Sequence, residues 1–456
     1  MIRLTAVLAW VGYTAGLYWI YISLHVYGHM PAWLALLGTG LLSAYVALYA
    51  VGAAATVRAL KLNFSDRSAP LVIAAVVTLF EWLRGHLFTG FPWLALGYLA
   101  VDTPLAGLAP VLGSYGVGFA VALTLALIAQ AIRYRYWSAL IAVVALLIAG
   151  FALSFSPFTE PAGRPLRAAL VQGAIPQSMK FDPARELQSI TTQLELARGA
   201  TTPGAAHLIV FPETALVRPW DFAAPDVREA FHRLASLSNA TVMLGLPMRD
   251  ADGYRNSLIA LEAQTPLDQF AGRYDKHHLV PFGEFIPWGF RWFVDAMKMP
   301  LGDFQRGAAV QPPITVRDQR IGVNICFEDL FGEEIIRPLH PSRPADDQPT
   351  VLLNVSNLAW FGNTIALSQH LAIARMRSME TGRPTLRATN TGATAAIDHR
   401  GRVLDMLPFG ESRLLITQVQ GMQGSTPFSR WGNLPIMALS ILLLAIAAVR
   451  RKVASR

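Results

Sequence analysis

Six apolar runs, each close to the length that crosses a bilayer, constrain this chain more than any other feature. A membrane-spanning helix needs about 20 predominantly apolar residues. The six runs lie at Leu4–Leu24, Trp33–Val57, Leu71–Phe88, Leu105–Ile132, Ser138–Phe155 and Leu434–Val449. The composition agrees, because 53% of the residues are hydrophobic and only 15% are charged, whereas ordinary soluble domains carry about 25% charged residues. We therefore expect an integral membrane protein with about six spans.

The first run is expected to be a retained span rather than a cleaved signal peptide. Arg3 is the only basic residue before it, and no clean small-residue cleavage site follows it. A signal peptide normally has both a basic start and such a site.

Ten basic residues of the membrane part lie on one side of the predicted spans. They are Arg3, Arg58, Lys61, Arg67, Arg133, Arg135, Arg450, Arg451, Lys452 and Arg456. The connections on the other side, residues 25–32 and 85–104, contain only Asp102 as a charged residue. The positive-inside rule then places both termini in the cytoplasm and the long interval 157–430 on the outer face. That interval has equal numbers of basic and acidic residues, so the basic excess indicates topology and not a nucleic-acid surface.

The composition divides the chain into three parts. Residues 1–156 form a predicted membrane domain with five spans, residues 157–430 an outer domain, and residues 431–456 a last span with a basic cytoplasmic tail. In the outer domain, helical patterns at 183–200 and 225–238 alternate with apolar strand-like runs, which favours a layered α/β fold. The predicted strands are Leu166–Gln172, His207–Phe211, Thr241–Leu246, Asn256–Leu261, Ile321–Ile325, Val351–Val355, Thr385–Thr389, Thr394–Asp398 and Leu414–Gln418.

The connection Arg84–Tyr98 is unusually rich in glycine, proline and aromatic residues. Two interpretations stay open: an aromatic belt at the membrane surface, or a wall of a lipid-facing cavity, where irregular backbone is tolerated. Glu81 and Arg84 are three residues apart at the end of the third run, so they can pair on one helix face.

Cys326 is the only cysteine in the 456 residues. It directly follows the predicted strand Ile321–Ile325, and a helix can begin at Glu328. A thiol at such a turn is exposed, and nearby backbone N–H groups point at the group it attacks. A lone cysteine is more often a small buried core residue, so the cysteine alone does not decide. A single thiol does exclude an intrachain disulfide and a multi-thiolate metal site, and we expect no metal and no cofactor.

Two charged residues, Glu213 and Lys276, also lie at the ends of strand-like runs, as Cys326 does. Glu213 follows the buried run at 207–211, and Lys276 lies in the segment 272–287. Singly, each is typical of a capping glutamate or a solvated lysine. Together with a thiol they can form a nucleophilic site, in which the glutamate takes the thiol proton and the lysine stabilises the thiolate and the developing oxyanion. The backbone N–H after Cys326 would complete the oxyanion hole.

Three motifs carry a family resemblance. Phe211-Pro-Glu213, Asp275-Lys-His-His-Leu-Val-Pro-Phe-Gly-Glu284 and Asn324-Ile-Cys-Phe-Glu328 resemble the motifs of the carbon–nitrogen hydrolase (nitrilase) superfamily. With the apolar spans and the stretches 89–93, 171–180 and 354–362, the chain is similar to the membrane branch of that superfamily, the apolipoprotein N-acyltransferases. The resemblance implies an αββα sandwich on a helical membrane base.

The same resemblance implies site residues. Glu213, Lys276 and Cys326 would form the catalytic triad, with Glu284 and Glu328 as further acidic residues beside it. Glu284 would orient Lys276 or share proton handling with Glu213. Five aromatic residues are expected to contact substrate: Trp93, Phe181, Phe327, Trp360 and Phe361.

The chain departs from the family pattern in two respects. The family usually has eight spans. The two family spans that have no counterpart in this chain would be the first two. Phe181 and Phe327 stand where many relatives have tryptophan or tyrosine. The apolar segment Phe285–Leu301 is expected to be a membrane-dipping arm, with an amphipathic core helix as the alternative.

The resemblance also implies an activity and a location. Cys326 would attack an acyl ester of a membrane phospholipid, and the thioester would pass its acyl chain to the α-amine of a lipoprotein's diacylglyceryl-cysteine. The expected partners are therefore a phospholipid donor, an apolipoprotein acceptor and the lipid bilayer, with no nucleic acid. The expected location is the bacterial inner membrane, multi-pass, with a periplasmic catalytic domain in a monomeric protein.

Two alternatives share part of the evidence. A membrane-tethered amidase would use the same triad with water as acceptor. A catalytically silent scaffold or transporter would need no triad, but transporters carry polar breaks within several spans, and here the charges lie mostly at span ends.

Overall fold

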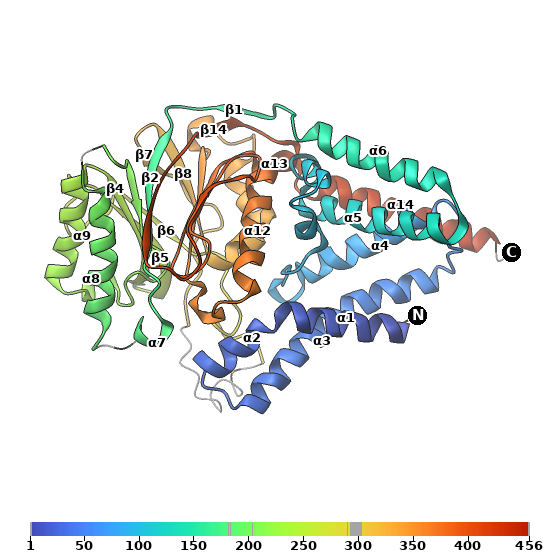
Figure 1. Cartoon of the computed structure of the whole chain (residues 1–456), viewed down its shortest axis with the longest axis horizontal. Coiled ribbons are helices and arrows are strands. Elements are labelled where there is room, and N and C mark those ends of the chain that lie inside the picture. The colour runs from blue at the N-terminus through green and yellow to red at the C-terminus, as the bar shows by residue number, and fades with distance from the viewer. Residues whose placement is uncertain are drawn as a thin grey trace.

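The computed structural model describes residues 2–180, 182, 184–202, 204–289, 291 and 303–454. It consists of a helical part and an α/β sandwich that lie side by side, and the two chain ends lie at the end of the helical part remote from the sandwich (Figure 1). The expected arm at 285–301 lies largely outside the described residues.

The helical part forms because the apolar runs of the sequence become helices. The helices are α1 (Ile2–Leu17), α2 (Trp19–Ile22), α3 (Ala32–Ala59), α4 (Ala69–Arg84), α5 (Ala109–Tyr134), α6 (Trp137–Leu153) and α14 (Leu434–Ala454).

Three of these helical stretches are long and apolar enough to cross a membrane, namely Ala32–Ala59, Pro104–Tyr134 and Leu434–Val453. A fourth is added if Ile2–Leu17 and Trp19–Tyr27, bent by 50° at their junction, count as one span. Helix α4 has 16 residues and α6 has 17, which is short for a span of about 20 residues. The described residues thus contain three to four candidate spans, and the count of six stays a prediction.

The sandwich contains two six-stranded sheets. The first has the order β13 (Arg413–Val419), β2 (Leu166–Gln172), β3 (Leu208–Val210), β4 (Thr241–Asp250), β5 (Gly253–Leu261) and β6 (Gly272–Asp275). The second has the order β12 (Val403–Met406), β11 (Ala395–Ile397), β10 (Thr385–Thr389), β9 (Val351–Ser356), β8 (Gln319–Ile325) and β7 (Ile314–Val316). A separate ribbon pairs β1 (Thr159–Pro161) with β14 (Met422–Gly424).

Buried aliphatic side chains fill the space between the two sheets. Leu170 and Val210 of the first sheet share one cluster with Ile325 and Val355 of the second. The outer face of the first sheet is covered by α8 (Glu186–Ala197) and α9 (Pro225–Ser238), whose apolar residues pack on it. This burial explains why the sequence reads as continuous apolar runs here, since strands covered on both faces have no polar side.

Helix α12 (Ile365–Thr381) covers the second sheet and separates it from the helical part (Figure 1). It contacts β10 through polar groups, including the 2.7 Å hydrogen bond between the Ser378 and Thr385 hydroxyls. The order of the layers is therefore helix, sheet, sheet, helix. This order confirms the expected αββα sandwich on a helical base. The short helices α7 (Gln177–Lys180), α11 (Gly332–Ile335) and α13 (Pro427–Trp431) complete the described fold.

The connection at 84–98 packs against the α/β sandwich. Trp93 and Tyr98 share a buried cluster with Phe327 and with Ile373 of α12. The expected pair of Glu81 and Arg84 is confirmed, with Arg84 Nη2 2.9 Å from Glu81 Oε1. The connection is thus an internal contact between the two parts of the molecule.

Glycine contacts in the helical part give a test of its packing. A Cβ on Gly150 of α6 would lie 2.3 Å from the carbonyl oxygen of Pro104, whereas one on Gly40 of α3 would meet nothing within 4 Å. We expect Gly150→Ala to lower the unfolding temperature in detergent, because overpacking costs about 1–3 kcal/mol. Gly40→Ala should leave it equal or higher, since alanine favours a helix over glycine by about 1 kcal/mol. Equal effects of the two substitutions would contradict the packing of α6.

Candidate active site

Glu213, Lys276 and Cys326 converge at one end of the sandwich. Glu213 follows β3 and Lys276 follows β6, both in the first sheet, while Cys326 directly follows β8 in the second. The sequence separates them by 63 and 50 positions, and the two sheets bring them together. Glu213 is 7% exposed and Lys276 1% exposed, while Cys326 is partly exposed.

The Lys276 ammonium lies between two carboxylates. Its Nζ is 2.9 Å from Glu284 Oε1 and 3.5 Å from Glu213 Oε1. Burial favours the neutral amine, but the charges of Glu284 and Glu213 outweigh it and raise the pKa of Lys276 above its ordinary value. Lys276 is therefore a fixed positive charge. The site also shows the expected contact of Glu284 with Lys276.

The Glu213 carboxylate acts on the Cys326 thiol through its negative charge. Burial, and after it the negative charge of Glu213, raises the pKa of the thiol above its ordinary value, and Lys276 opposes this only in part. The resting thiol thus keeps its proton, and Glu213 is placed to accept it. This is the arrangement of a nucleophile with an adjacent general base.

The backbone at Cys326 is strained. Its φ is +53°, in the left-handed region that a side chain with a Cβ seldom adopts. The residue opens the 3₁₀ turn Cys326–Leu330 directly after β8. A tight strand-to-helix turn therefore presents the sulfur, as the sequence predicted.

Two asparagines that the sequence analysis did not single out hold the carboxylates. Asn256 Nδ2 donates to Glu213 Oε1 at 2.8 Å and to Glu284 Oε1 at 2.6 Å. The backbone N–H of Asn357 donates to the other oxygen of Glu213 at 2.8 Å. The only available signal for Asn256 was a polar residue in a predicted buried strand.

Lys180 is a second buried lysine near the site, and it also escaped the sequence analysis. Its Nζ donates to the backbone carbonyl of Glu213 at 3.1 Å. Burial lowers its pKa to about 7, although the charge of Glu213 works in the opposite direction. Lys180 therefore supports the turn that carries Glu213 and does not pair with the carboxylate.

Glu328 connects two loops of the site. Its carboxylate accepts from the N–H groups of His277 at 2.7 Å and Ile325 at 2.7 Å, and from the Tyr274 hydroxyl at 2.9 Å. Burial raises its pKa to about 7 against the effect of these hydrogen bonds. These hydrogen bonds fix the loops of Lys276 and Cys326 to each other, so the place of Glu328 indicates that it positions both residues.

Three of the aromatic residues expected to contact substrate, Trp93, Phe327 and Phe361, belong to one apolar cluster. Trp93 lies 6.2 Å from Phe361 between ring centroids, and Trp19, which the sequence analysis missed, lies within 4.8 Å of both. Phe327 packs 5.3 Å from Phe331, and Trp360 lies against Tyr27. Phe181 lies outside the described residues.

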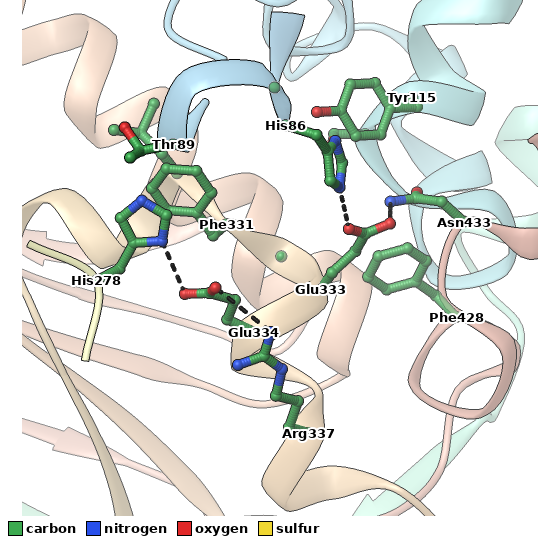
Figure 2. A pocket seen from close by; sticks show the side chains of 14 residues that line it. His86, Thr89, Tyr115, His278, Phe331, Glu333, Glu334, Arg337, Phe428 and Asn433 are labelled. Atoms are coloured by element: carbon green, nitrogen blue, oxygen red, sulfur yellow. Dashed lines mark hydrogen bonds and ion pairs between the residues drawn. The ribbon is translucent and has the colours of Figure 1, made fainter. Parts of the chain in front are cut away.

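A cavity of about 210 Å³ lies beside this site, where the helical part meets the sandwich (Figure 2). Two imidazole–carboxylate pairs line it: His86 Nε2 is 2.5 Å from Glu333 Oε2, and His278 Nδ1 is 3.1 Å from Glu334 Oε2. The three motif residues Glu213, Lys276 and Cys326 do not line it. Among the residues that the structure describes, no group of three or more His, Cys, Asp or Glu side chains is arranged to hold a metal ion.

Comparison with known proteins shows to which class of protein the sandwich belongs. Residues 167–428, which contain the sandwich and all three motif residues, match the family model for carbon-nitrogen hydrolase. The sandwich is thus an enzyme domain of the carbon–nitrogen hydrolase class. Among solved structures, a CN-hydrolase superfamily protein from Xanthomonas campestris shares 18% identity, with a TM-score of 0.43 over 57% of this chain and 91% of that chain.

Matches to the rest of the chain narrow the assignment to one family within this class. Residues 1–127 match the model for the apolipoprotein N-acyltransferase N-terminal domain. The apolipoprotein N-acyltransferase of Ralstonia nicotianae is 47% identical, covering 97% of this chain and 85% of the relative. That of Bordetella bronchiseptica is 45% identical, covering 97% and 86%. The chain belongs to the apolipoprotein N-acyltransferase family.

The His86–Glu333 pair gives a pH-dependent contribution to stability. Burial alone would lower the pKa of His86, but the Glu333 carboxylate raises it above 6.5. Burial alone would raise the pKa of Glu333, but His86 lowers it below 4.5. The pair therefore stabilises the fold most between pH 4.5 and 6.5; the histidine loses its share as the pH rises through its folded pKa, and the glutamate loses its share as the pH falls through its own.

We expect the unfolding temperature of His86→Gln to fall below that of the wild type by the largest margin within this pH window. The exposed His340 provides a matched control, and His340→Gln should give a small difference that does not vary in this way. A margin that grows from pH 6.5 to 9 would contradict the assigned pair.

Proposed function

We propose that the protein is a phospholipid-to-apolipoprotein N-acyltransferase that works through a thioester on Cys326. The family assignment supplies the reaction class. What supports the mechanism is the single arrangement in which the Cys326 thiol keeps its proton beside the Glu213 carboxylate, which is itself paired with the buried ammonium of Lys276.

In the first half-reaction, the Cys326 sulfur attacks the carbonyl carbon of a phospholipid ester while Glu213 takes the thiol proton. The carbonyl oxygen becomes an oxyanion, which Lys276 and the backbone N–H after Cys326 stabilise. Collapse of the intermediate breaks the ester C–O bond. Glu213 returns its proton to the leaving oxygen, so a lysophospholipid departs and the acyl chain stays on sulfur.

In the second half-reaction, the α-amine of a diacylglyceryl-cysteine attacks the thioester carbonyl. Glu213 accepts the ammonium proton that forms, and the C–S bond breaks when the intermediate collapses. The proton then passes from Glu213 to the departing sulfur. The resting thiol is restored and the lipoprotein carries an amide.

The other roles follow from position. Glu284 orients Lys276, and Glu328 holds the two loops together. Trp93, Phe327, Trp360 and Phe361 are proposed to contact the acyl chain or headgroup. The proposed setting is the bacterial inner membrane, with a membrane domain at 1–156, a periplasmic catalytic domain at 157–430 and a last span and tail at 431–456, in a monomer.

Variants of the site residues test this mechanism in detergent micelles that contain a phospholipid with a labelled acyl chain and a diacylglyceryl-cysteine peptide. Cys326→Ser should form no N-acyl peptide. Glu213→Gln should slow its formation by about 10²–10⁴-fold, the usual contribution of a general base. Glu186→Gln is the matched control, because Glu186 pairs with Arg218 on the remote helix α8 and should keep the wild-type rate.

The products separate the alternatives. N-acyl peptide supports transfer, whereas free fatty acid at saturating peptide would identify a hydrolase that uses water. Retained transfer in Cys326→Ser would remove Cys326 as the nucleophile.

A further inference from the structure

The carbonyl oxygen of Cys326 is held by side chains that are distant in the sequence. His370 Nε2 lies 3.2 Å from it and Asn354 Nδ2 lies 3.4 Å from it. The same planar peptide unit contains this carbonyl and the N–H of Phe327, and in a trans peptide the two point in opposite directions. Any group that fixes the Cys326 carbonyl therefore also fixes the direction of the Phe327 N–H.

The contacts of His370 define which of its nitrogens carries the proton. Arg387 Nη2 lies 2.8 Å from His370 Nδ1, and a guanidinium can only donate. Nδ1 must therefore accept, which leaves the proton on Nε2, where it faces the Cys326 carbonyl. Burial, and after it the charge of Arg387, lowers the pKa of His370 well below its ordinary value, so the ring stays neutral in this tautomer.

The imidazole ring is fixed from both sides. Arg387 is itself paired with Asp329, three residues after the nucleophile, and the Asp329 carboxylate lies 3.8 Å from His370 Nε2. On the other side, the ring of Trp93 stacks on His370 with a centroid distance of 5.6 Å and an angle of 7°. Trp93 Nε1 also donates to Gln369, the residue before His370, at 2.8 Å.

We propose that His370 is a positioning residue for catalysis: its Nε2–H holds the Cys326–Phe327 peptide so that the Phe327 N–H faces the oxyanion. The strained φ of Cys326 needs such support, because a residue in a sparsely populated conformation persists only where its surroundings determine it. This inference rests on the proposed acyl transfer for its substrate, but its geometry applies to any ester that acylates Cys326.

Two substitutions test the N–H donor and the aromatic ring of His370 separately. His370→Gln keeps an N–H donor near the position of Nε2, whereas His370→Phe keeps an aromatic ring for Trp93 and removes the donor. We expect His370→Phe to slow acylation of Cys326 by a p-nitrophenyl ester by about 10²-fold, the effect of misplacing a reacting group by about 1 Å. His370→Gln should recover most of the rate. The burst of p-nitrophenol measures acylation without a phospholipid or a peptide, so a failure of the proposed substrates would not affect this test.

Alkylation of Cys326 by iodoacetamide is the internal reference. Alkylation forms no oxyanion, so its rate should change little in His370→Phe while acylation falls. An equal loss of both rates, or no loss of acylation, would overturn the proposal. So would a His370→Gln variant as slow as His370→Phe.

Ser378→Ala controls for stability, since Ser378 lies on the same helix and loses one buried hydrogen bond away from the site; it should keep the wild-type acylation rate. If His370→Phe fails to fold, the ¹⁵N spectrum of labelled wild-type protein still decides. A neutral His370 ring with its proton on Nε2 from pH 5 to 8 is expected, and a proton on Nδ1 or a titration in that range would overturn the assignment.

Discussion

The ion cluster of Lys276 with Glu213 and Glu284 is the interaction on which the catalytic site depends. A buried ammonium is costly to desolvate and needs close, well-oriented partners. Here the two carboxylates supply them, and Asn256 Nδ2 contacts both carboxylates. Because two negative charges face one positive charge, the cluster does not draw a proton from the neighbouring thiol. It leaves the Glu213 carboxylate beside a thiol that keeps its proton.

The fold places this cluster where its two sheets meet. Glu213 and Lys276 come from the first sheet and Cys326 from the second, so the site exists only when the sandwich is assembled. Glu328 adds a direct connection between the loops of Lys276 and Cys326. The helical part also contributes, because the connection after α4 carries Trp93 onto the face of His370, and His370 in turn contacts the Cys326 peptide. Cys326 is thus supported from both parts of the chain.

The sequence predicted those helices and strands whose apolar pattern follows directly from which residues are buried. The strands β2 and β10 and the helix α9 have the predicted bounds, because their apolar patterns reflect burial directly. Helix α12 was missed: it buries Arg377, Glu380 and His370, and these polar residues hide the usual apolar stripe. The strands β1, β6, β7, β12 and β14 were missed because each has only three or four residues and includes partly or fully exposed ones. The strands β3 and β11 are equally short but wholly buried, and they were predicted.

The site was predictable only where a motif marks it. Glu213, Lys276, Cys326 and Glu284 were identified from their motifs and converge in the structure, although their catalytic roles stay proposals. Asn256 and His370 reach the site through tertiary contacts that no local pattern records.

The protonation state of Cys326 tests the central claim most directly. The difference in ultraviolet thiolate absorbance between wild type and Cys326→Ser reports on this thiol alone, because the chain has one cysteine. If Glu213 acts as a base toward a neutral thiol, no thiolate should form at neutral pH, and its midpoint should lie above the ordinary value of 9.0. A midpoint below about 7, as in cysteines activated by a cation, would show a preformed thiolate–ammonium pair and contradict the account.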